Sequence, residues 1–287
     1  MANATSTPPI DSVHFWDNIH LFLLVWAILF TIIEIISLVK KFPYHWRTRH
    51  LRKVWGLKNG DYVNVICSEL DDPKQRQLVE PREFIYNLKY GDVDAYFEVV
   101  VTLLQLFPNI KLRVLSAGEA ENTRIDMTRH LILIGGPDYN EITDRILKKG
   151  ITQYNYRSPY VEERSSQHPD EIVIYDVVDK DKEYCHFTDE KDYGYFERLR
   201  NPNNTKTNII LLGGCHTIGV TGAVKAFSMA ESERGEIHSV VLENAKKVAQ
   251  KLAKKSEFSI LISAERVGQT INVPLVDVNL LTVRNDN

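Results

Sequence analysis

The run from Leu21 to Val39 constrains the fold most, because Glu34 is its only charged residue. As a helix these 19 residues reach about 28 Å, close to the hydrocarbon thickness of a bilayer. A buried helix of a globular domain needs a polar face, and this run has none. The residues before it carry no Lys or Arg and no small-residue cleavage pattern follows, which disfavours a cleaved signal peptide. The sequence therefore predicts a single transmembrane helix over 21–39.

Basic residues follow this run, and such residues are retained on the cytoplasmic side of a membrane. They predict a single-pass protein of the plasma (inner) membrane with its N-terminus outside. Residues 1–20 then form an extracytoplasmic tail, 40–59 a basic juxtamembrane linker that contacts membrane lipid, and 60–287 a cytoplasmic domain. The basic residues are Lys40, Lys41, Arg47, Arg49, Arg52, Lys53 and Lys58.

Glu34 is unusual in such a run, because a carboxylate in hydrocarbon is unfavourable unless it is protonated, paired or turned toward protein. Two interpretations stay open. The side chain either reaches the interface or stays neutral, or it shares a helix face with Thr31 and forms a helix contact in a homo-oligomer, with a pore as one possible result.

The composition of the chain argues against nucleic acid as a direct partner, because the net charge is only −3. The three cysteines, Cys67, Cys185 and Cys215, are too few and too scattered for a disulfide framework or a zinc site. The histidines show no metal-binding spacing. We predict no metal and no resident cofactor.

Short apolar runs alternate with helical segments beyond residue 60. Most runs are continuously apolar, as in strands buried on both faces of a parallel sheet, and the intervals have helical periodicity. This alternation predicts a doubly wound, mostly parallel Rossmann-like α/β domain, with a polar insertion at about 158–204. The predicted strands are Tyr62–Cys67, Ile110–Leu115, His130–Ile134, Glu171–Val177, Asn208–Leu212 and Glu257–Ser263. The alternating stretch Val273–Val283 is expected to pair antiparallel at the sheet edge.

Two glycine-bearing turns each follow a strand and precede a helix. Glycines at such a turn allow a sharp bend, and the first N–H groups of the next helix point outward, which makes an anion site. Parallel strands would bring both turns to one edge, where α/β folds bind ligands. The predicted ligand-binding residues are Gly135, Gly136, Asn140, Gly213, Gly214, His216, Thr217, Gly219, Thr221 and Gly222.

Several of these residues also have structural interpretations, which stay open. Asn140 either reads a base or ribose, or caps a helix. Thr217 and Thr221 either donate to a phosphate or cap the helix. His216 either contacts ligand or acts with Cys215 in catalysis, although no orienting carboxylate is identifiable from sequence.

The segment Gly213-Gly214 with Gly219-Val220-Thr221-Gly222-Ala223 resembles the glycine-rich turn of the LOG-like (SLOG) Rossmannoid superfamily. It lacks the catalytic Arg and Glu motif of the enzymes in that group. The phosphate-loop pattern is also incomplete, because Val220 stands in place of its lysine. The resemblance implies a nucleotide-sensing domain in prokaryotic signalling or defence.

Three functions follow as alternatives. The first is a membrane-anchored sensor that binds a nucleotide-like anion at the two turns and couples binding to membrane helix assembly. The second is a membrane-tethered nucleotide or nucleoside hydrolase that uses acidic residues, and the third is an anchored interaction scaffold. We favour the sensor over an enzyme; an enzyme would be expected to hydrolyse a nucleotide or an N-glycosidic bond.

Overall fold

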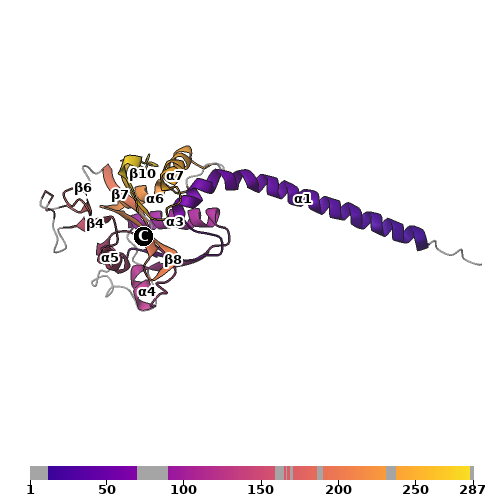
Figure 1. Ribbon diagram of the computed structural model, residues 1–287, viewed down its shortest axis with the longest axis horizontal. Helices are drawn as coiled ribbons and strands as arrows, with labels where there is room; N and C mark the ends of the chain where they lie inside the picture. The colour runs from indigo at the N-terminus through magenta and orange to yellow at the C-terminus, as the bar shows by residue number, and fades with distance from the viewer. Residues whose placement is uncertain are drawn as a thin grey trace, which may run out of the picture. The chain divides into compact units, whose positions relative to one another are not determined.

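The computed structural model describes residues 12–69, 90–158, 165, 167–168, 171–185, 190–230 and 237–284. The side chains of 12–21, 32–43, 90–91 and 185 lie outside this description. The chain divides into two units, residues 1–48 and 49–287, which are considered separately. A single helix, α1 (Ser12–Trp55), runs from the first unit into the second (Figure 1).

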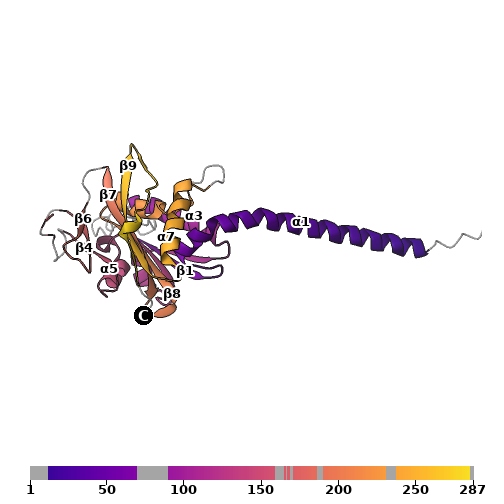
Figure 2. The same cartoon turned by 45° about the horizontal axis from the view of Figure 1, so that its top comes forward.

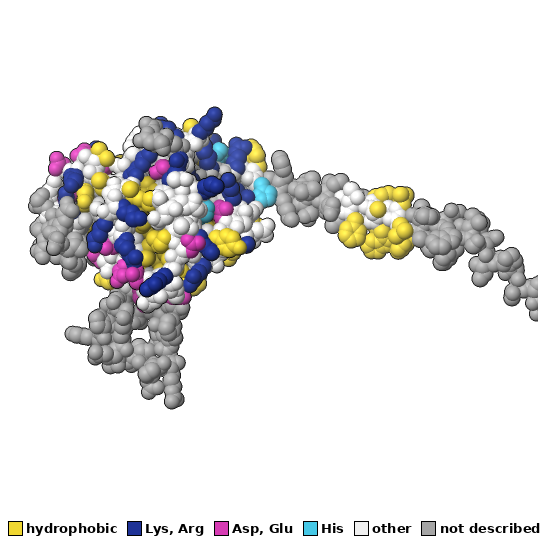
Figure 3. All heavy atoms as spheres, turned by 60° about the horizontal axis from the view of Figure 1, so that its bottom comes forward, with side chains coloured by type: hydrophobic (Ala, Val, Ile, Leu, Met, Phe, Trp, Pro, Cys, Tyr) yellow, Lys and Arg dark blue, Asp and Glu magenta, His cyan; other side chains and the backbone are white. Residues whose placement is uncertain are grey.

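The first unit consists of the larger part of α1. Its described side chains from Phe22 to Phe30 are mostly apolar and exposed, as the yellow stretch of the helix in Figure 3 shows. Within the described part of the chain, no helix combines the length and the apolar character that crossing a membrane requires.

This finding contradicts the predicted transmembrane helix at 21–39 and the predicted location in the plasma membrane with the N-terminus outside. Thr31 donates a hydrogen bond from its hydroxyl to the Ala27 carbonyl oxygen (2.8 Å), within the same helix. The Glu34 side chain lies outside the described residues, so the predicted helix contact of Thr31 and Glu34 in a homo-oligomer stays a prediction. The helix also continues through most of 40–59, the segment predicted as a linker.

The second unit is built on an eight-stranded mixed sheet. Its strand order is β10-β9-β7-β8-β3-β1-β2, and β11 pairs with β9 as well. The strands are β1 (Tyr62–Cys67), β2 (Lys111–Ser116), β3 (His130–Ile134), β7 (Lys191–Asn201), β8 (Asn204–Gly214), β9 (Phe258–Val267), β10 (Thr270–Ile271) and β11 (Leu281–Val283). A second sheet has the order β4-β5-β6, formed by β4 (Tyr154–Arg157), β5 (Val173–Asp176) and β6 (Glu183–Cys185).

The mixed character of the main sheet corrects the predicted mostly parallel arrangement. Strands β2, β1, β3 and β8 are parallel neighbours, but β7 pairs antiparallel with both β8 and β9. The physical reason is a hairpin, because the turn between Asn201 and Asn204 folds β7 back along β8. Strand β11 pairs antiparallel with β9, which confirms the expectation for the last three residues of the stretch Val273–Val283 but not for the residues before them.

Helices cover both faces of the main sheet (Figures 1 and 2). One face packs against α4, α5 and the small sheet, and the other against α3, α6, α7 and the last turns of α1. The side chains of alternate residues in β3 point to opposite faces of the sheet. Leu131 and Leu133 belong to the hydrophobic cluster on the face that α4, α5 and the small sheet cover. The helices are α3 (Tyr90–Leu106), α4 (Ala117–Asn122), α5 (Glu141–Leu147), α6 (Thr217–Lys225) and α7 (Ser239–Leu252), with 3-10 turns η1 (Pro137–Tyr139) and η3 (Val278–Leu280).

Strand β7 carries charged side chains in the interior of the sheet. Arg198 is 3% exposed and donates to the main-chain oxygens of Lys53, Val54 and Ser256. It thereby satisfies carbonyl groups at the C-terminal end of α1, where a positive charge is also favourable. These bonds keep the end of the helix attached to the sheet.

Glu197 of the same strand is fully buried. Its Oε1 atom accepts from the backbone N–H of Gln153 (2.6 Å) and lies 3.2 Å from an Arg284 guanidinium nitrogen. Burial disfavours the charged form and raises the pKa of Glu197 to about 7, although Arg284 opposes this shift. The carboxyl group of Glu197 is therefore close to half-protonated at neutral pH.

This shift predicts that the contribution of Glu197 to the unfolding free energy falls as the pH rises. Because the pKa of Glu197 is raised from 4.5 to about 7 on folding, its contribution is complete below pH 4.5 and is lost as the pH passes 7. Between pH 5 and 8 the free energy of unfolding should therefore decrease by roughly 2.5 kcal/mol more in the natural protein than in Glu197→Gln. Urea unfolding at each pH measures the difference. If the unfolding free energy changed equally with pH in the natural protein and in Glu197→Gln, the account would be contradicted. It would also be contradicted if the exposed control Glu243→Gln reduced this pH dependence as much as Glu197→Gln does.

Candidate functional site

The carboxyl ends of β2, β1, β3 and β8 lie along one edge of the sheet, because these four strands are parallel. The chain passes from β1 outward to β2 and then returns across β1 to β3. The strand order therefore reverses between β1 and β3. Open α/β sheets bind ligands in the crevice at such a switch point.

The first glycine turn follows β3 at this edge. Gly135 has φ +96°, a conformation that favours glycine, and a Cβ there would overlap the Ser68 hydroxyl. Its N–H donates to the Leu212 carbonyl oxygen of the neighbouring strand β8 (3.0 Å). Gly136 is extended and precedes η1. The Gly135 N–H is thus used by the sheet.

Asn140, predicted as a ligand contact, is fully buried and caps α5. Its Oδ1 accepts from the Thr143 N–H (3.1 Å), and its Nδ2 donates to the main-chain oxygens of Ile134 (3.3 Å) and Ile66 (3.5 Å). The side chain therefore joins the ends of β1 and β3. Of the two interpretations of Asn140 from sequence, the structure shows the helix cap.

The second glycine turn follows β8, beside the first, since Ile134 and Leu212 are opposite each other in the sheet. The side chain of Asp192 in β7, the strand that pairs with β8, contacts the start of α6. Its Oδ2 accepts from the backbone N–H groups of His216 (2.9 Å) and Gly219 (2.6 Å). The position predicted to receive a ligand anion is thus occupied by a carboxylate of the chain itself.

The other predicted residues of this turn pack α6 closely on the sheet. A Cβ at Gly219 would collide with the Tyr193 carbonyl, and one at Gly222 with the Ala264 side chain. Gly213 and Gly214 end β8 and are buried against α6 and the tyrosine side chains nearby. Thr221 is buried, whereas Thr217 and His216 are half-buried at the start of the helix.

Burial governs the protonation of Asp192. Removal of the carboxyl group from water raises its pKa, while the N–H groups of Gly219 and His216 and the nearby His216 charge oppose the rise. The carboxylate gains two charge-assisted hydrogen bonds at the positive end of α6. An incoming phosphate at this point would have to displace Asp192 from both N–H groups.

A third helix start at this edge has a similar contact. Glu69, which follows β1, accepts at Oε2 from the Gly118 N–H of α4 (2.9 Å). Its own backbone N–H donates to the main-chain carbonyl oxygen of Tyr139 (2.9 Å). These contacts frame a cleft of about 380 Å³ beside the β1–β3 switch point. We call it the switch-point cleft. Its lining residues are Glu69, Ala117, Gly118, Glu121, Asn122, Asp138, Tyr139 and Glu141.

Four of the lining residues are acidic, which makes the cleft electronegative. Arg145 forms an ion pair with Glu121 and offsets one of these charges. The Tyr139 side chain is 39% exposed and contributes an aromatic ring. Among the described residues, no group of three or more His, Cys, Asp or Glu side chains is arranged to hold a metal ion.

Asp192 lies within the polar insertion predicted at about 158–204, and the sequence patterns give no role to Asp192 or Tyr139. A hairpin signal was present, because the turn at 201–204 followed by an apolar strand implies an antiparallel partner before it. Extending the β7–β8 pairing from Gly194 opposite Gly214 brings Asp192 opposite His216. Tyr139 gives no comparable signal, since only the folded η1 turn brings it to the cleft.

Comparison with models of known protein families and with curated proteins finds no match for this chain.

Removal of the Asp192 carboxylate should destabilise the start of α6. Asp192→Ala leaves the His216 and Gly219 N–H groups without this acceptor, and we expect a loss of about 2–4 kcal/mol of unfolding free energy. Asp192→Asn retains an acceptor oxygen and should lose less than half as much. Chemical denaturation measures both.

The exposed acid Asp179 provides the matched control, because it pairs with Lys182 at the surface. Asp179→Ala should change the unfolding free energy by no more than about 0.5 kcal/mol. If Asp192→Ala were as mild as this control, the described role of Asp192 would be wrong.

Proposed function

We propose that this protein is a binding domain that senses a nucleotide-like ligand and receives its nucleoside part in the switch-point cleft. The observation that carries the proposal is the position of this cleft, at the carboxyl ends of β1 and β3 where the strand order reverses. Its volume of about 380 Å³ is in the range of small-molecule sites.

The chemistry of the cleft favours ribose hydroxyls. Glu69 is held in place by the Gly118 N–H through Oε2, so its Oε1 atom keeps acceptor capacity toward the cleft. A carboxylate accepts two vicinal hydroxyl groups well, as the acidic residue of dinucleotide-binding folds does for ribose. Tyr139 offers a ring on which a base can stack.

The charges of the edge favour the nucleoside over the phosphates. Four carboxylates line the cleft, and Asp192 occupies the start of α6, so a phosphate meets like charge at both places. The proposed ligand therefore places its base and ribose in the cleft and any phosphate toward solvent. This differs from the phosphate-centred site that the glycine turns predict from sequence.

A sensor needs a ligand that binds one state of the protein better than another. A hydrolase of nucleotides or nucleosides would use the same acidic cleft, and a scaffold would bind no small molecule there. Analysis of the ligand after binding separates the hydrolase from the sensor, because only an enzyme converts the ligand. The resemblance to LOG-like domains agrees with either of these two.

The test is calorimetric titration of the full chain with adenosine, AMP and ATP at one ionic strength, followed by chromatography of each mixture. Adenosine should bind at least as tightly as AMP and be recovered intact. ATP should bind about tenfold more weakly at low salt, because its phosphates are repelled by the cleft. Glu69→Gln should weaken adenosine binding by about tenfold or more, since a charge-assisted hydrogen bond is lost.

Glu243→Gln is the control, because Glu243 pairs with Lys247 on the surface of α7. It should leave the adenosine affinity unchanged. ATP binding more tightly than adenosine, with no effect of Glu69→Gln, would overturn the proposal. Released base would assign the hydrolase, and absence of binding by all three compounds would favour the scaffold.

A further inference from the structure

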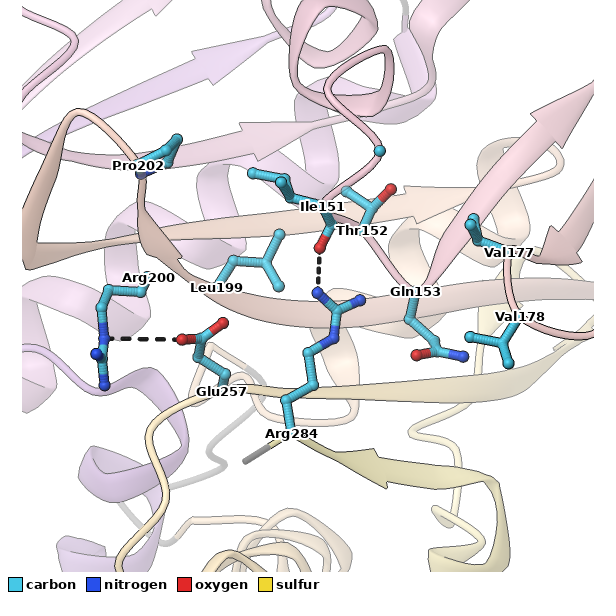
Figure 4. A pocket seen from close by; sticks show the side chains of 11 residues that line it. Ile151, Thr152, Gln153, Val177, Val178, Leu199, Arg200, Pro202, Glu257 and Arg284 are labelled. Carbon is cyan, nitrogen blue, oxygen red and sulfur yellow. Dashed lines mark hydrogen bonds and ion pairs between the residues drawn. The ribbon is translucent and has the colours of Figure 1, made fainter. Parts of the chain in front are cut away.

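A second cavity, of about 570 Å³, lies at the opposite edge of the main sheet, where β7 ends and β9 begins (Figure 4). Segments that are distant in sequence meet there: the loop before β4, the end of β5, the end of β7 and the residue after β11. The lining residues are Gly150, Ile151, Thr152, Gln153, Val177, Val178, Leu199, Arg200, Pro202, Glu257 and Arg284.

Arg284 provides a cationic group in this cavity. Figure 4 shows its guanidinium between Ile151 and Gln153, where it donates to the Ile151 carbonyl oxygen. A second bond goes to Glu197, behind the cavity wall (3.2 Å). A guanidinium has five N–H donors, so these two contacts leave donor capacity for an anion.

The remaining wall is largely apolar, with one unsatisfied polar group. Leu199 is buried at the cavity, while Val178 is 84% exposed at its rim. Thr152 is 3% exposed, and its buried hydroxyl has no hydrogen-bond partner among the described residues. A buried polar group without a partner is uncommon and indicates a position where a ligand or water completes the bonding. Arg200 and Glu257 pair with each other at the far side (3.7 Å), as Figure 4 shows.

We propose that this cavity is a second ligand site that binds a small organic carboxylate, with the carboxylate on Arg284 and an apolar chain against Leu199 and Val178. A planar guanidinium accepts a carboxylate through paired N–H···O bonds. The apolar wall selects a chain of several carbons over a bare inorganic anion. This site is independent of the switch-point cleft and does not rest on the function proposed for it.

Glu197 makes the affinity of this site depend on pH, because it shares Arg284 with the ligand. The groups that face Glu197 are Arg284, the phenols of Tyr154 and Tyr195, the Ser259 hydroxyl and the Gln153 N–H. Burial raises the pKa of both tyrosines, so they stay neutral. When Glu197 releases its proton near pH 7, its charge competes with the ligand for the guanidinium. Binding should therefore weaken as the pH rises.

Calorimetric titration of the full chain with sodium hexanoate and with hexanamide tests this site. Hexanoate should bind at least about tenfold more tightly than the uncharged amide at pH 6. Its affinity should fall at least threefold between pH 6 and pH 8 in the natural protein and stay constant in Glu197→Gln. Arg284→Gln should abolish the preference for hexanoate.

A variant at the exposed rim keeps the test independent of folding. Val178→Glu should weaken hexanoate binding at least fivefold by charge repulsion, whereas the uncharged Val178→Gln should change it less than twofold. Equal affinity for hexanoate and hexanamide, or full binding in both Val178→Glu and Arg284→Gln, would overturn the proposal. So would hexanoate binding whose pH dependence is the same in Glu197→Gln.

Discussion

The carboxylate of Asp192 bonds to the first N–H groups of α6, and this contact decides what the carboxyl edge of the sheet can bind. A helix start after a glycine-rich turn is normally open to an anion. Here the anion belongs to the chain, and Glu69 makes a similar contact with the start of α4. The edge keeps the switch-point topology of an open α/β sheet, but carboxylates of the chain lie at two of its helix starts. For this reason the proposed ligand is recognised by its hydroxyls and ring and not by a phosphate.

Strand β7 supplies this contact and connects it to the rest of the second unit. Asp192 holds α6, Glu197 holds Gln153 and Arg284, and Arg198 holds the carbonyls at the end of α1. Each charged side chain is buried, and each makes hydrogen bonds or ion pairs with specific partners that offset part of the lost hydration. The strand thus bonds to elements on both faces of the sheet. It lies between the second glycine turn at one edge and the Arg284 cavity at the other.

The buried parallel strands were predictable because they are continuously apolar. Strands β1 and β3 have the bounds expected from sequence. Strand β7 was not recognised, since Glu197, Arg198 and Arg200 interrupt its apolar pattern and resemble a surface segment. Hydrophobic periodicity infers burial from the residue types along one segment. It does not detect these buried charges, because the groups that pair with them come from distant segments. The missed strand also concealed Asp192.

The glycine turns illustrate a different limit. Their sequence indicates a close backbone approach, and the approach exists, but at Gly219 and Gly222 the neighbour is the sheet itself. A local motif does not reveal whether the group that packs against a glycine is a ligand or another segment of the chain. The apolar run at 21–39 likewise indicated a membrane span, while the described part of the chain contains no helix that meets the requirements of one.

A crystal structure of the full chain with bound AMP tests the central claim most directly. The account predicts density for ribose in the switch-point cleft, with its hydroxyls within hydrogen-bond distance of Glu69, and Asp192 still bonded to the His216 and Gly219 N–H groups. A phosphate seated on those two N–H groups, with the Asp192 side chain displaced, would contradict it.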